Sequence, residues 1–316
     1  MIYQLKPITD ITIWGGKILN EIRGLKDTKG GTSWEISFHP YGINEVIGLN
    51  TNLKELLDKD PKGLIGDIDK EEVLRLAYLD ADEWLSVQLH PNNDYALNNG
   101  YDYGKFEAWY IIDAKPNAKL MAGTTIESKE ELIEAIESGN IEEKMIYHPV
   151  KKGDFIYIPA NALHALGKDI LAIEISTNSN TTFRVYDYKR KDKDGNLREL
   201  HLKQVVDCVD LSLLPTVISS DDSVKNELIP LTQNEYFEVY RVNIDEKFTL
   251  NNIENDAWYV TILNKGLEIE TIKTKLSENL LVSAKINSFT IKGNGSILLS
   301  RTTKWKIYLV ILISIS

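Results

Sequence analysis

The fold is decided by the stretch Gly153-Asp-Phe-Ile-Tyr-Ile-Pro-Ala-Asn-Ala-Leu-His-Ala165. A glycine supplies a turn, residues 154–158 are rich in aromatic and β-branched side chains, and Pro159 ends them. This pattern predicts a short strand between two turns, followed by His164. Similar short runs recur along the chain between turn signals, which is typical of an all-β sandwich or barrel such as the jelly roll.

Further strands are expected wherever such runs occur. They are residues 85–90, 108–112, 171–175, 237–242, 258–263 and 296–300. Helical periodicity is sparse and is clearest in Ser128–Gly139, which begins with an N-cap serine and ends at a glycine. Shorter helical turns are expected at 53–57 and in 69–78, the latter running into a strand. The sequence therefore predicts a mainly β protein of two jelly-roll sandwich or barrel domains with a few short helices.

Composition narrows the class of protein. The chain has 316 residues, of which 43% are hydrophobic and 26% charged, as expected for a globular protein with a sizeable core. Its net charge of -11 argues against a nucleic-acid partner, so a phosphorylated ligand would need a local basic cluster. The single cysteine, Cys208, excludes an internal disulfide framework. The first residues lack the pattern of a signal peptide, so a cytoplasmic location without membrane contact is expected.

A linker is predicted at residues 211–230, which contain two prolines and a Ser/Asp cluster. It separates a metal-binding catalytic domain, residues 1–215, from a second β domain, residues 216–316, without metal ligands. All five histidines precede the linker, so imidazole chemistry is expected in the first domain. The apolar tail 307–316 is about half the length of a membrane span and is expected to form a final buried strand. A surface anchor and a tail altered by a frame change are the alternatives.

Two short motifs carry polar side chains of the types that bind metals. Gln88 and His90 alternate with apolar residues, so both point to one face of a strand, about 7 Å apart. Lys105 and Glu107 share a face in the same way. Each motif taken alone also fits a solvated polar face.

Two later segments carry ionisable groups among apolar residues. Glu174 interrupts an otherwise apolar strand, and a buried carboxylate needs a partner or a shifted pKa. Basic residues then gather at Arg184 and at 189–191, although the chain is acidic overall. The second group also fits a solvated hairpin tip, whereas Arg184 lies between two apolar residues.

Together these motifs resemble type I mannose-6-phosphate isomerase, in the short two-cupin form common in bacteria. The spacing G-x5-P-x-[G/N]-x2-H that ends at His164 resembles the second signature of the cupin superfamily, in which this histidine is a metal ligand. The resemblance covers about residues 5–210, in order. Its segments are 13–16, 31–37, 88–91, 105–110, 158–165, 178–190 and 198–201.

The resemblance implies a metal site and a reaction. One Zn²⁺ per chain would be held by Gln88, His90, Glu107 and His164. The implied activity is the interconversion of mannose 6-phosphate and fructose 6-phosphate through a cis-enediol intermediate. Two imidazoles and a carboxylate suit zinc, but they also describe non-haem iron sites, so an iron-dependent cupin oxygenase is an alternative.

The resemblance also implies roles for five basic and acidic residues. Arg184, Lys105 and Glu174 would be catalytic: Lys105 and Glu174 are acid/base candidates, and Arg184 would stabilise an oxyanion or hold substrate. Lys189 and Arg190 would bind the phosphate.

One departure from the family pattern motivates a different function. Asn180 stands where the family usually has an aspartate, which motivates a non-catalytic or regulatory sugar-phosphate-binding cupin as the alternative. The sequence leaves open whether the protein is a monomer or a homodimer.

Overall fold

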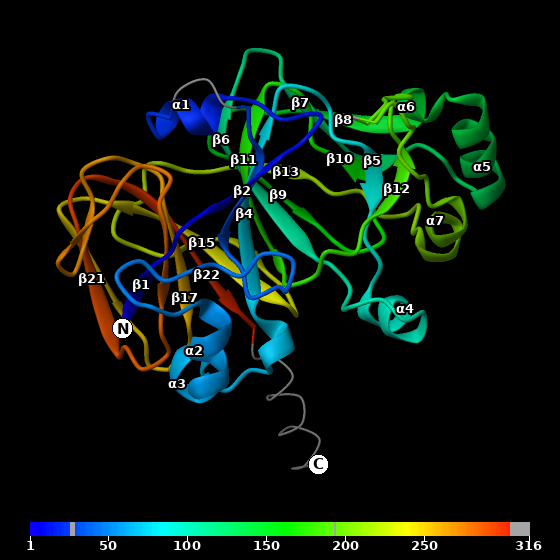
Figure 1. The fold of residues 1–316 in the computed structure, drawn as a ribbon. Helices are drawn as coiled ribbons and strands as arrows, with labels where there is room; N and C mark the ends of the chain where they lie inside the picture. The colour runs from blue at the N-terminus through cyan, green and yellow to red at the C-terminus, as the bar shows by residue number, and fades with distance from the viewer. Residues whose placement is uncertain (26–28, 193, 304–316) are drawn as a thin grey trace, which may run out of the picture. The chain divides into compact units, whose positions relative to one another are not determined.

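The computed structural model describes residues 1–25, 29–192 and 194–303 (Figure 1). The predicted strand in the tail 307–316 lies outside these residues. The chain divides into two compact units, one of residues 9–33 and 78–219 and one of residues 1–8, 34–77 and 220 onward. The chain passes from one unit to the other for the last time after residue 219, close to the boundary predicted after residue 215. Residues 1–8 group with the later residues through the pairing of β1 (Ile2–Gln4) with β20 (Asn279–Val282), and residues 34–77 through backbone hydrogen bonds such as that from Ala284 to the Leu64 carbonyl.

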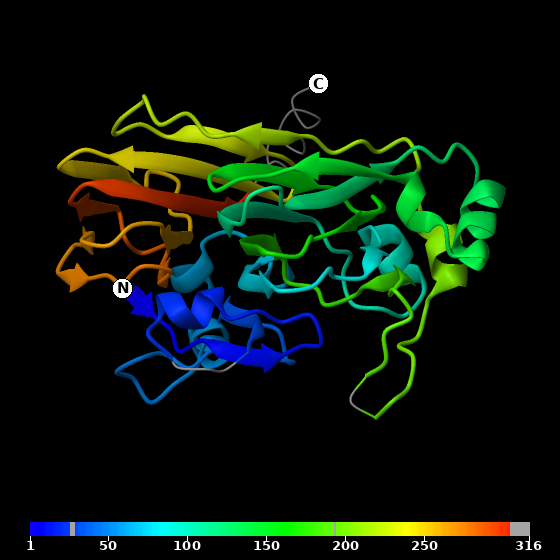
Figure 2. The ribbon, with the colours of Figure 1, turned by 90° about the horizontal axis from the view of Figure 1, so that it is seen from above.

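The unit containing residues 78–219 is built on two antiparallel sheets (Figure 2). One has the order β12-β5-β10-β7-β8, and the other has the order β13-β9-β6-β11-β4-β3-β2, in which β2, β3 and β4 lie only partly in this unit. The strands are β2 (Ile8–Ile11), β3 (Gly31–Ile36), β4 (Leu74–Ala81), β5 (Val87–Leu89), β6 (Glu107–Ala114), β7 (Lys119–Thr124), β8 (Met145–Pro149), β9 (Asp154–Ile158), β10 (His164–Ala165), β11 (Ile170–Thr177), β12 (Phe183–Tyr186) and β13 (Val217–Ser219). The helices are α1 (Ile18–Ile22), α4 (Asn93–Asn98), α5 (Lys129–Ser138), α6 (Ile141–Lys144) and α7 (Leu202–Cys208).

Alternation along β5 decides which side chains face the interior. Val87 and Leu89 join an apolar cluster with residues of α5, α6 and α7, such as Leu132 and Val205. The three helices lie beside the five-stranded sheet (Figure 1). Because successive side chains point to opposite faces, Gln88 lies on the other face of this sheet. Its amide lies 3.4 Å from the ring of His164, on the side predicted for it, whereas His90 lies just beyond the end of β5.

The predicted helix at 128–139 is confirmed as α5. The Ser128 side chain accepts a hydrogen bond from the backbone N–H of Glu131 at 3.1 Å, and Gly139 ends the helix with φ 78°. Glycine adopts this left-handed conformation at little cost. The segment 69–78 forms a three-residue 3-10 helix, Lys70–Glu72, that runs into β4. The predicted linker is not wholly irregular, since β13 pairs with β9 inside it.

The other unit is also mainly antiparallel sheet. Its sheets have the orders β1-β20-β17-β22-β15-β14 and β16-β21-β18-β19, and an apolar cluster including Trp258 and Phe289 forms its core. Its elements are β1 (Ile2–Gln4), α2 (Leu53–Lys59), α3 (Pro61–Ile65), β14 (Ile229–Gln233), β15 (Phe237–Ile244), β16 (Lys247–Asn251), β17 (Trp258–Ile262), β18 (Glu268–Ile269), β19 (Ile272–Lys273), β20 (Asn279–Val282), β21 (Ser288–Lys292) and β22 (Gly295–Thr302). Among the described residues, no helix is both long and apolar enough to cross a membrane.

Candidate metal centre

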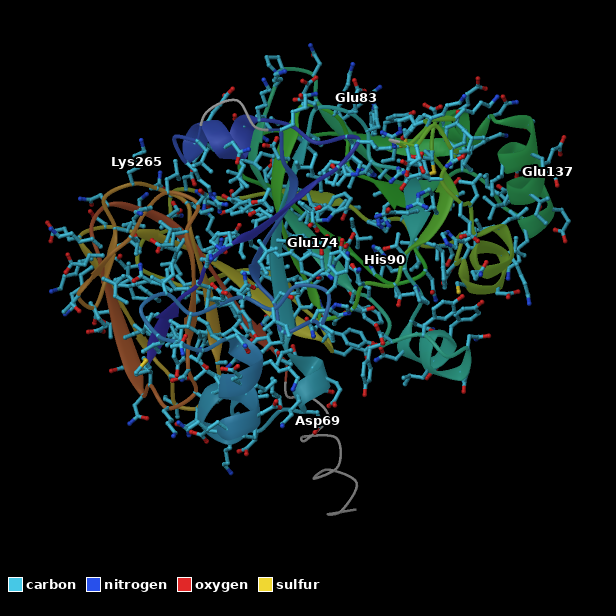
Figure 3. All side chains as sticks on the ribbon, in the orientation of Figure 1. Asp69, Glu83, His90, Glu137, Glu174 and Lys265 are labelled. Carbon is cyan, nitrogen blue, oxygen red and sulfur yellow. The ribbon has the colours of Figure 1, made fainter. Side chains whose placement is uncertain are left out.

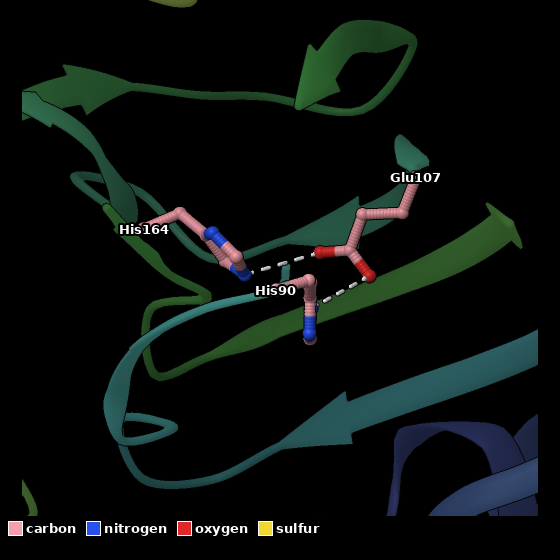
Figure 4. Close-up of side chains that lie close together, drawn as sticks. All are labelled: His90, Glu107 and His164. Carbon is pink, nitrogen blue, oxygen red and sulfur yellow. Dashed lines mark ion pairs between the residues drawn. The ribbon is translucent and has the colours of Figure 1, made fainter. Parts of the chain in front are cut away.

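Three side chains that could bind a metal lie close together in the unit that contains residues 78–219 (Figure 4). His90 follows β5, Glu107 opens β6 and His164 opens β10, and all three are buried. The Nε2 atom of His164 lies 3.2 Å from Glu107 Oε1, and Nε2 of His90 lies 3.4 Å from Oε2. One ligand atom from each residue lies within 4.8 Å of the others.

Backbone contacts fix the orientation of both imidazoles. The Nδ1 atom of His90 lies 2.9 Å from the carbonyl oxygen of Thr181, and Nδ1 of His164 lies 2.9 Å from that of Ala162. A carbonyl oxygen only accepts hydrogen bonds, so we assign the ring hydrogen to Nδ1 in each case. Nε2 then carries a lone pair toward Glu107, which is the arrangement that metal-binding histidines adopt.

The atoms facing the centre fit a bound cation. Among the described residues, no hydrogen bond reaches His90 Nε2 or either carboxylate oxygen of Glu107, although all three atoms are buried. Lys105 Nζ forms an ion pair with Oε2 at 2.5 Å. Buried polar atoms without hydrogen bonds are costly, and a divalent cation would satisfy them together.

The charges at this centre also suit a metal. Burial opposes ionisation of Glu107, but the nearby Lys105 ammonium and the close imidazoles of His90 and His164 outweigh it and hold the pKa of this carboxyl well below its usual range. Burial, followed by the charge of Lys105, lowers the pKa of His90 to about 4. At neutral pH the centre therefore presents an ionised carboxylate and a neutral His90, as metal ligation requires.

We expect the metal-free protein to lose stability as pH falls from about 6.5 to about 4. In this window unfolded His90 binds a proton and folded His90 does not, so stability rises with pH, by at most about 1.4 kcal/mol per pH unit. Urea unfolding at pH 5 and pH 7 measures it. The His90→Gln variant should lack this part of the pH dependence. Subtracting its slope cancels the contributions of other titrating groups, such as Asp80, because burial raises the pKa of Asp80 to about 6. Equal slopes in the two proteins would contradict the assignment.

Gln88 occupies the neighbouring position in the sheet. It is paired in register with His164 on β10 and with Arg184 on β12, so the three side chains share one face. Its Nε2 lies 3.4 Å from His164 Nε2, and Ser86 Oγ donates to its Oε1 at 3.2 Å. A half-turn of the amide exchanges oxygen and nitrogen and would direct the oxygen toward the centre. This position suits a fourth ligand.

Lys105 links the centre to a second carboxylate. Its ammonium lies 2.5 Å from Glu107 Oε2 and 3.0 Å from Glu174 Oε1, and all three side chains are buried. Ser176 donates a hydrogen bond to the same oxygen of Glu174 at 2.9 Å. His90 and Glu174 are the two ends of this row of contacts and are labelled in Figure 3. The buried carboxylate predicted on β11 thus has the partners that it needs.

No family model matches the chain. Mannose-6-phosphate isomerase ManA of Bacillus subtilis is 33% identical over 306 residues, which cover 93% of this chain and 97% of that protein. The mannose-6-phosphate isomerase of Streptococcus mutans is 32% identical over 303 residues, covering 92% and 95%. The chain belongs to the mannose-6-phosphate isomerase family.

Solved structures of mannose-6-phosphate isomerases share the fold. The crystal structure of the Bacillus subtilis mannose 6-phosphate isomerase matches with a TM-score of 0.86 at 31% identity, covering 95% of this chain and 99% of that one. A mannose 6-phosphate isomerase solved with zinc and yttrium has a TM-score of 0.71 at 13% identity over 96% of this chain and 99% of that one, a likeness of fold. The predicted family and its mainly β, cupin-type fold are confirmed.

In this member of the mannose-6-phosphate isomerase family, the three basic residues predicted to bind substrate or phosphate differ from one another in burial and in hydrogen bonding. Arg184 is half-buried on β12 and donates from Nη1 to the carbonyl of Glu199 at 2.8 Å. Arg190 donates to the carbonyl of Trp84 at 2.6 Å. Lys189 is exposed. Among the described residues, no hydrogen bond or ion pair joins Lys189 or Arg190 to His90, Glu107 or His164, and their role stays a prediction.

Sequence reasoning missed two residues beside Arg190. Asp187 is buried and pairs with both Arg190 and Arg198. In the sequence, Asp187 lies within a run of basic residues and Arg198 follows eleven residues later. This pattern indicates that Asp187 has a basic partner, but it does not indicate that Arg198 is that partner. His201, left without a role by its sequence context, exchanges hydrogen bonds with the backbone of Arg184.

Proposed function

We propose that this protein interconverts mannose 6-phosphate and fructose 6-phosphate, using one zinc ion held by His90, Glu107, His164 and Gln88. The observation that carries the proposal is the buried group of two imidazoles and a carboxylate with ligand atoms within 4.8 Å, in a chain of this isomerase family. Nitrogen and carboxylate ligands favour zinc, and the zinc-containing structure of the same fold supports this choice.

The reaction needs a proton to move between adjacent carbons. A base takes the proton from C2 of the open-chain aldose as the C1 oxygen gains one, which forms the cis-enediol. The proton is then returned at C1 while the C2 oxygen loses its own. When bound, zinc supplies a Lewis acid that stabilises negative charge on these oxygens.

The chain's own residues supply the proton transfer. Glu174 and Lys105 are the proposed acid/base pair, because they are in contact with each other and with Glu107 in a buried site. Arg184 shares the sheet face of Gln88 and His164, and we assign it to oxyanion stabilisation or substrate holding. Lys189 and Arg190 are proposed for the phosphate. A cytoplasmic location and the choice between monomer and homodimer stay predictions from the sequence.

Metal removal tests the proposed function. We expect purified protein to form fructose 6-phosphate from mannose 6-phosphate in a coupled assay, to lose this activity on dialysis against a chelator, and to regain it with about one zinc per chain. Full activity after complete metal removal would contradict metal dependence. Tight binding of mannose 6-phosphate without turnover in the zinc-loaded protein would instead favour the regulatory cupin. Oxygen consumption by an iron-loaded protein would favour the oxygenase.

A further inference from the structure

Asp187 holds two arginines on one buried carboxylate. Arg198 Nε donates to its Oδ2 at 2.6 Å, and Arg190 Nη2 donates to Oδ1 at 2.5 Å. Arg198 Nη2 also donates to Oδ1. Burial opposes ionisation of Asp187, but the hydrogen bonds from Arg198 and Arg190 outweigh it and lower the pKa of this carboxyl. The carboxylate therefore fixes two permanently charged groups in place.

The path of the chain brings Arg198 back to this carboxylate. Tyr188 and Lys189 have φ values of 55° and 53°, as in a type I′ turn, so the chain reverses immediately after Asp187. Lys191 then forms an antiparallel bridge with Leu197. Figure 2 shows the segment after β12 leaving the sheet and returning to it.

Arg190 and Arg198 differ in how many N–H donors remain available to bind an anion. A guanidinium has five N–H donors. Arg190 uses Nε, Nη1 and Nη2 for Asp187 and the Trp84 carbonyl. Within the part of the chain that the structure describes, the Arg198 side chain donates hydrogen bonds to Asp187 alone, from Nε and Nη2, which leaves its Nη1 available. Arg198 thus has more donors available than Arg190, the residue that the sequence pointed to.

Arg184 lies between this cluster and the metal-binding group: its Nη1 donates to the carbonyl of Glu199, the neighbour of Arg198, at 2.8 Å, and its strand position is paired with Gln88. Burial and then the charge of Arg198 lower the pKa of Arg184, and Arg190 acts in the same direction, while Asp187 and Glu199 oppose them. The Nε atom of Arg184 is buried and has no hydrogen-bond partner among the described residues. Two guanidiniums pair with Asp187, and Arg184 is a third cation against the two carboxylates Asp187 and Glu199, which leaves an excess positive charge next to a strand row that contains Gln88 and His164.

We propose that Arg198 is a further ligand of the substrate phosphate, in addition to the predicted Lys189 and Arg190, and that Asp187 positions it, an inference that rests on the proposed function. A phosphate monoester carries nearly two negative charges at neutral pH and accepts paired hydrogen bonds from a guanidinium fork. Because Asp187 already fixes the side chain of Arg198, little further ordering is needed on binding. Asp187 does not touch the substrate in this arrangement and acts through Arg198.

The test compares Arg198→Met and Asp187→Asn with the zinc-loaded wild type. We expect Arg198→Met to raise KM for mannose 6-phosphate and Ki for inorganic phosphate by about 10- to 100-fold, with kcat changed less than about threefold. Asp187→Asn should raise both constants by about tenfold, because the guanidinium loses its anchor and keeps its charge. Arg198→Lys should fall between wild type and Arg198→Met, because it restores the charge without the fork.

The control removes an exposed cation of the same unit. Lys115→Met breaks the surface ion pair with Asp169 and should leave KM and Ki unchanged. Unchanged constants in Arg198→Met, in an enzyme that turns over mannose 6-phosphate, would overturn the inference and leave the proposed function intact. A fall in kcat with unchanged KM and Ki would overturn it as well. Failure of the wild type itself to turn over substrate would be a failure of the proposed function.

Discussion

Glu107→Gln should lower kcat/KM for mannose 6-phosphate by about a thousandfold or more and reduce bound zinc to a small fraction of one per chain. The substitution keeps the shape of the side chain and removes the charge that two imidazoles and an ammonium surround. Lewis-acid stabilisation of the transition state amounts to several kcal/mol, and each 1.36 kcal/mol is a factor of ten in rate. Metal analysis and the coupled assay measure the two effects together.

The matched control for this variant is Glu131→Gln, because Glu131 is a carboxylate of α5 paired with Lys144 away from the centre. It should keep full activity and full zinc content. His164→Ala removes an imidazole ligand instead of a carboxylate, and it should also lower both the activity and the zinc content. Full activity in Glu107→Gln and His164→Ala, with the protein folded by circular dichroism, would reject the metal centre.

Lys105→Met is expected to lower kcat by roughly 10²- to 10⁴-fold while zinc stays bound, which separates proton transfer from metal binding. The ammonium contacts both Glu107 and Glu174, so its loss removes an acid/base group and leaves the ligand set intact. Glu174→Gln should have a comparable effect on kcat. The measurements are kcat, zinc content and the primary isotope effect with substrate deuterated at C2.

Removing one member of a buried ion pair costs roughly 3–5 kcal/mol of stability, so folding needs its own control. The double variant Lys105→Met/Glu174→Gln leaves no unpaired charge at position 174 and should be more stable than Lys105→Met, yet remain as inactive. Lys119→Met, which removes an exposed cation that lies over Tyr147, should be fully active. Zinc loss in Lys105→Met as large as in Glu107→Gln would show that Lys105 serves the metal site rather than the chemistry.

The convergence of His90, Glu107 and His164 is predicted through the resemblance to the isomerase family, whereas local signals predict only the strand or turn that carries each residue. Alternation sends one set of side chains to the interior, and the spacing from Gly153 to His164 belongs to a single strand and turn. These features depend on residues close together in sequence.

The parts that escaped prediction depend on contacts between distant or weakly patterned segments. The anchoring of Arg198 by Asp187 requires two chain reversals, and nothing in the residues between them encodes where the second one ends. β13 is short and lies among prolines and polar residues, so its pairing with β9 outweighed a local pattern typical of a linker. The grouping of residues 1–8 and 34–77 with the later residues follows from the pairing of β1 with β20 and from backbone hydrogen bonds of Gly63 and Leu64, long-range contacts that no local pattern reveals.

The pairing of β1 with β20 has a consequence for synthesis of the protein. A ribosome makes β1 long before its hydrogen-bonding partner β20, which begins at residue 279. The N-terminal segment must therefore wait, unpaired, until residues 279–282 have left the exit tunnel. The three side chains of the candidate metal centre, by contrast, have all been made once residue 164 is added, so their unit is able to assemble earlier on the nascent chain.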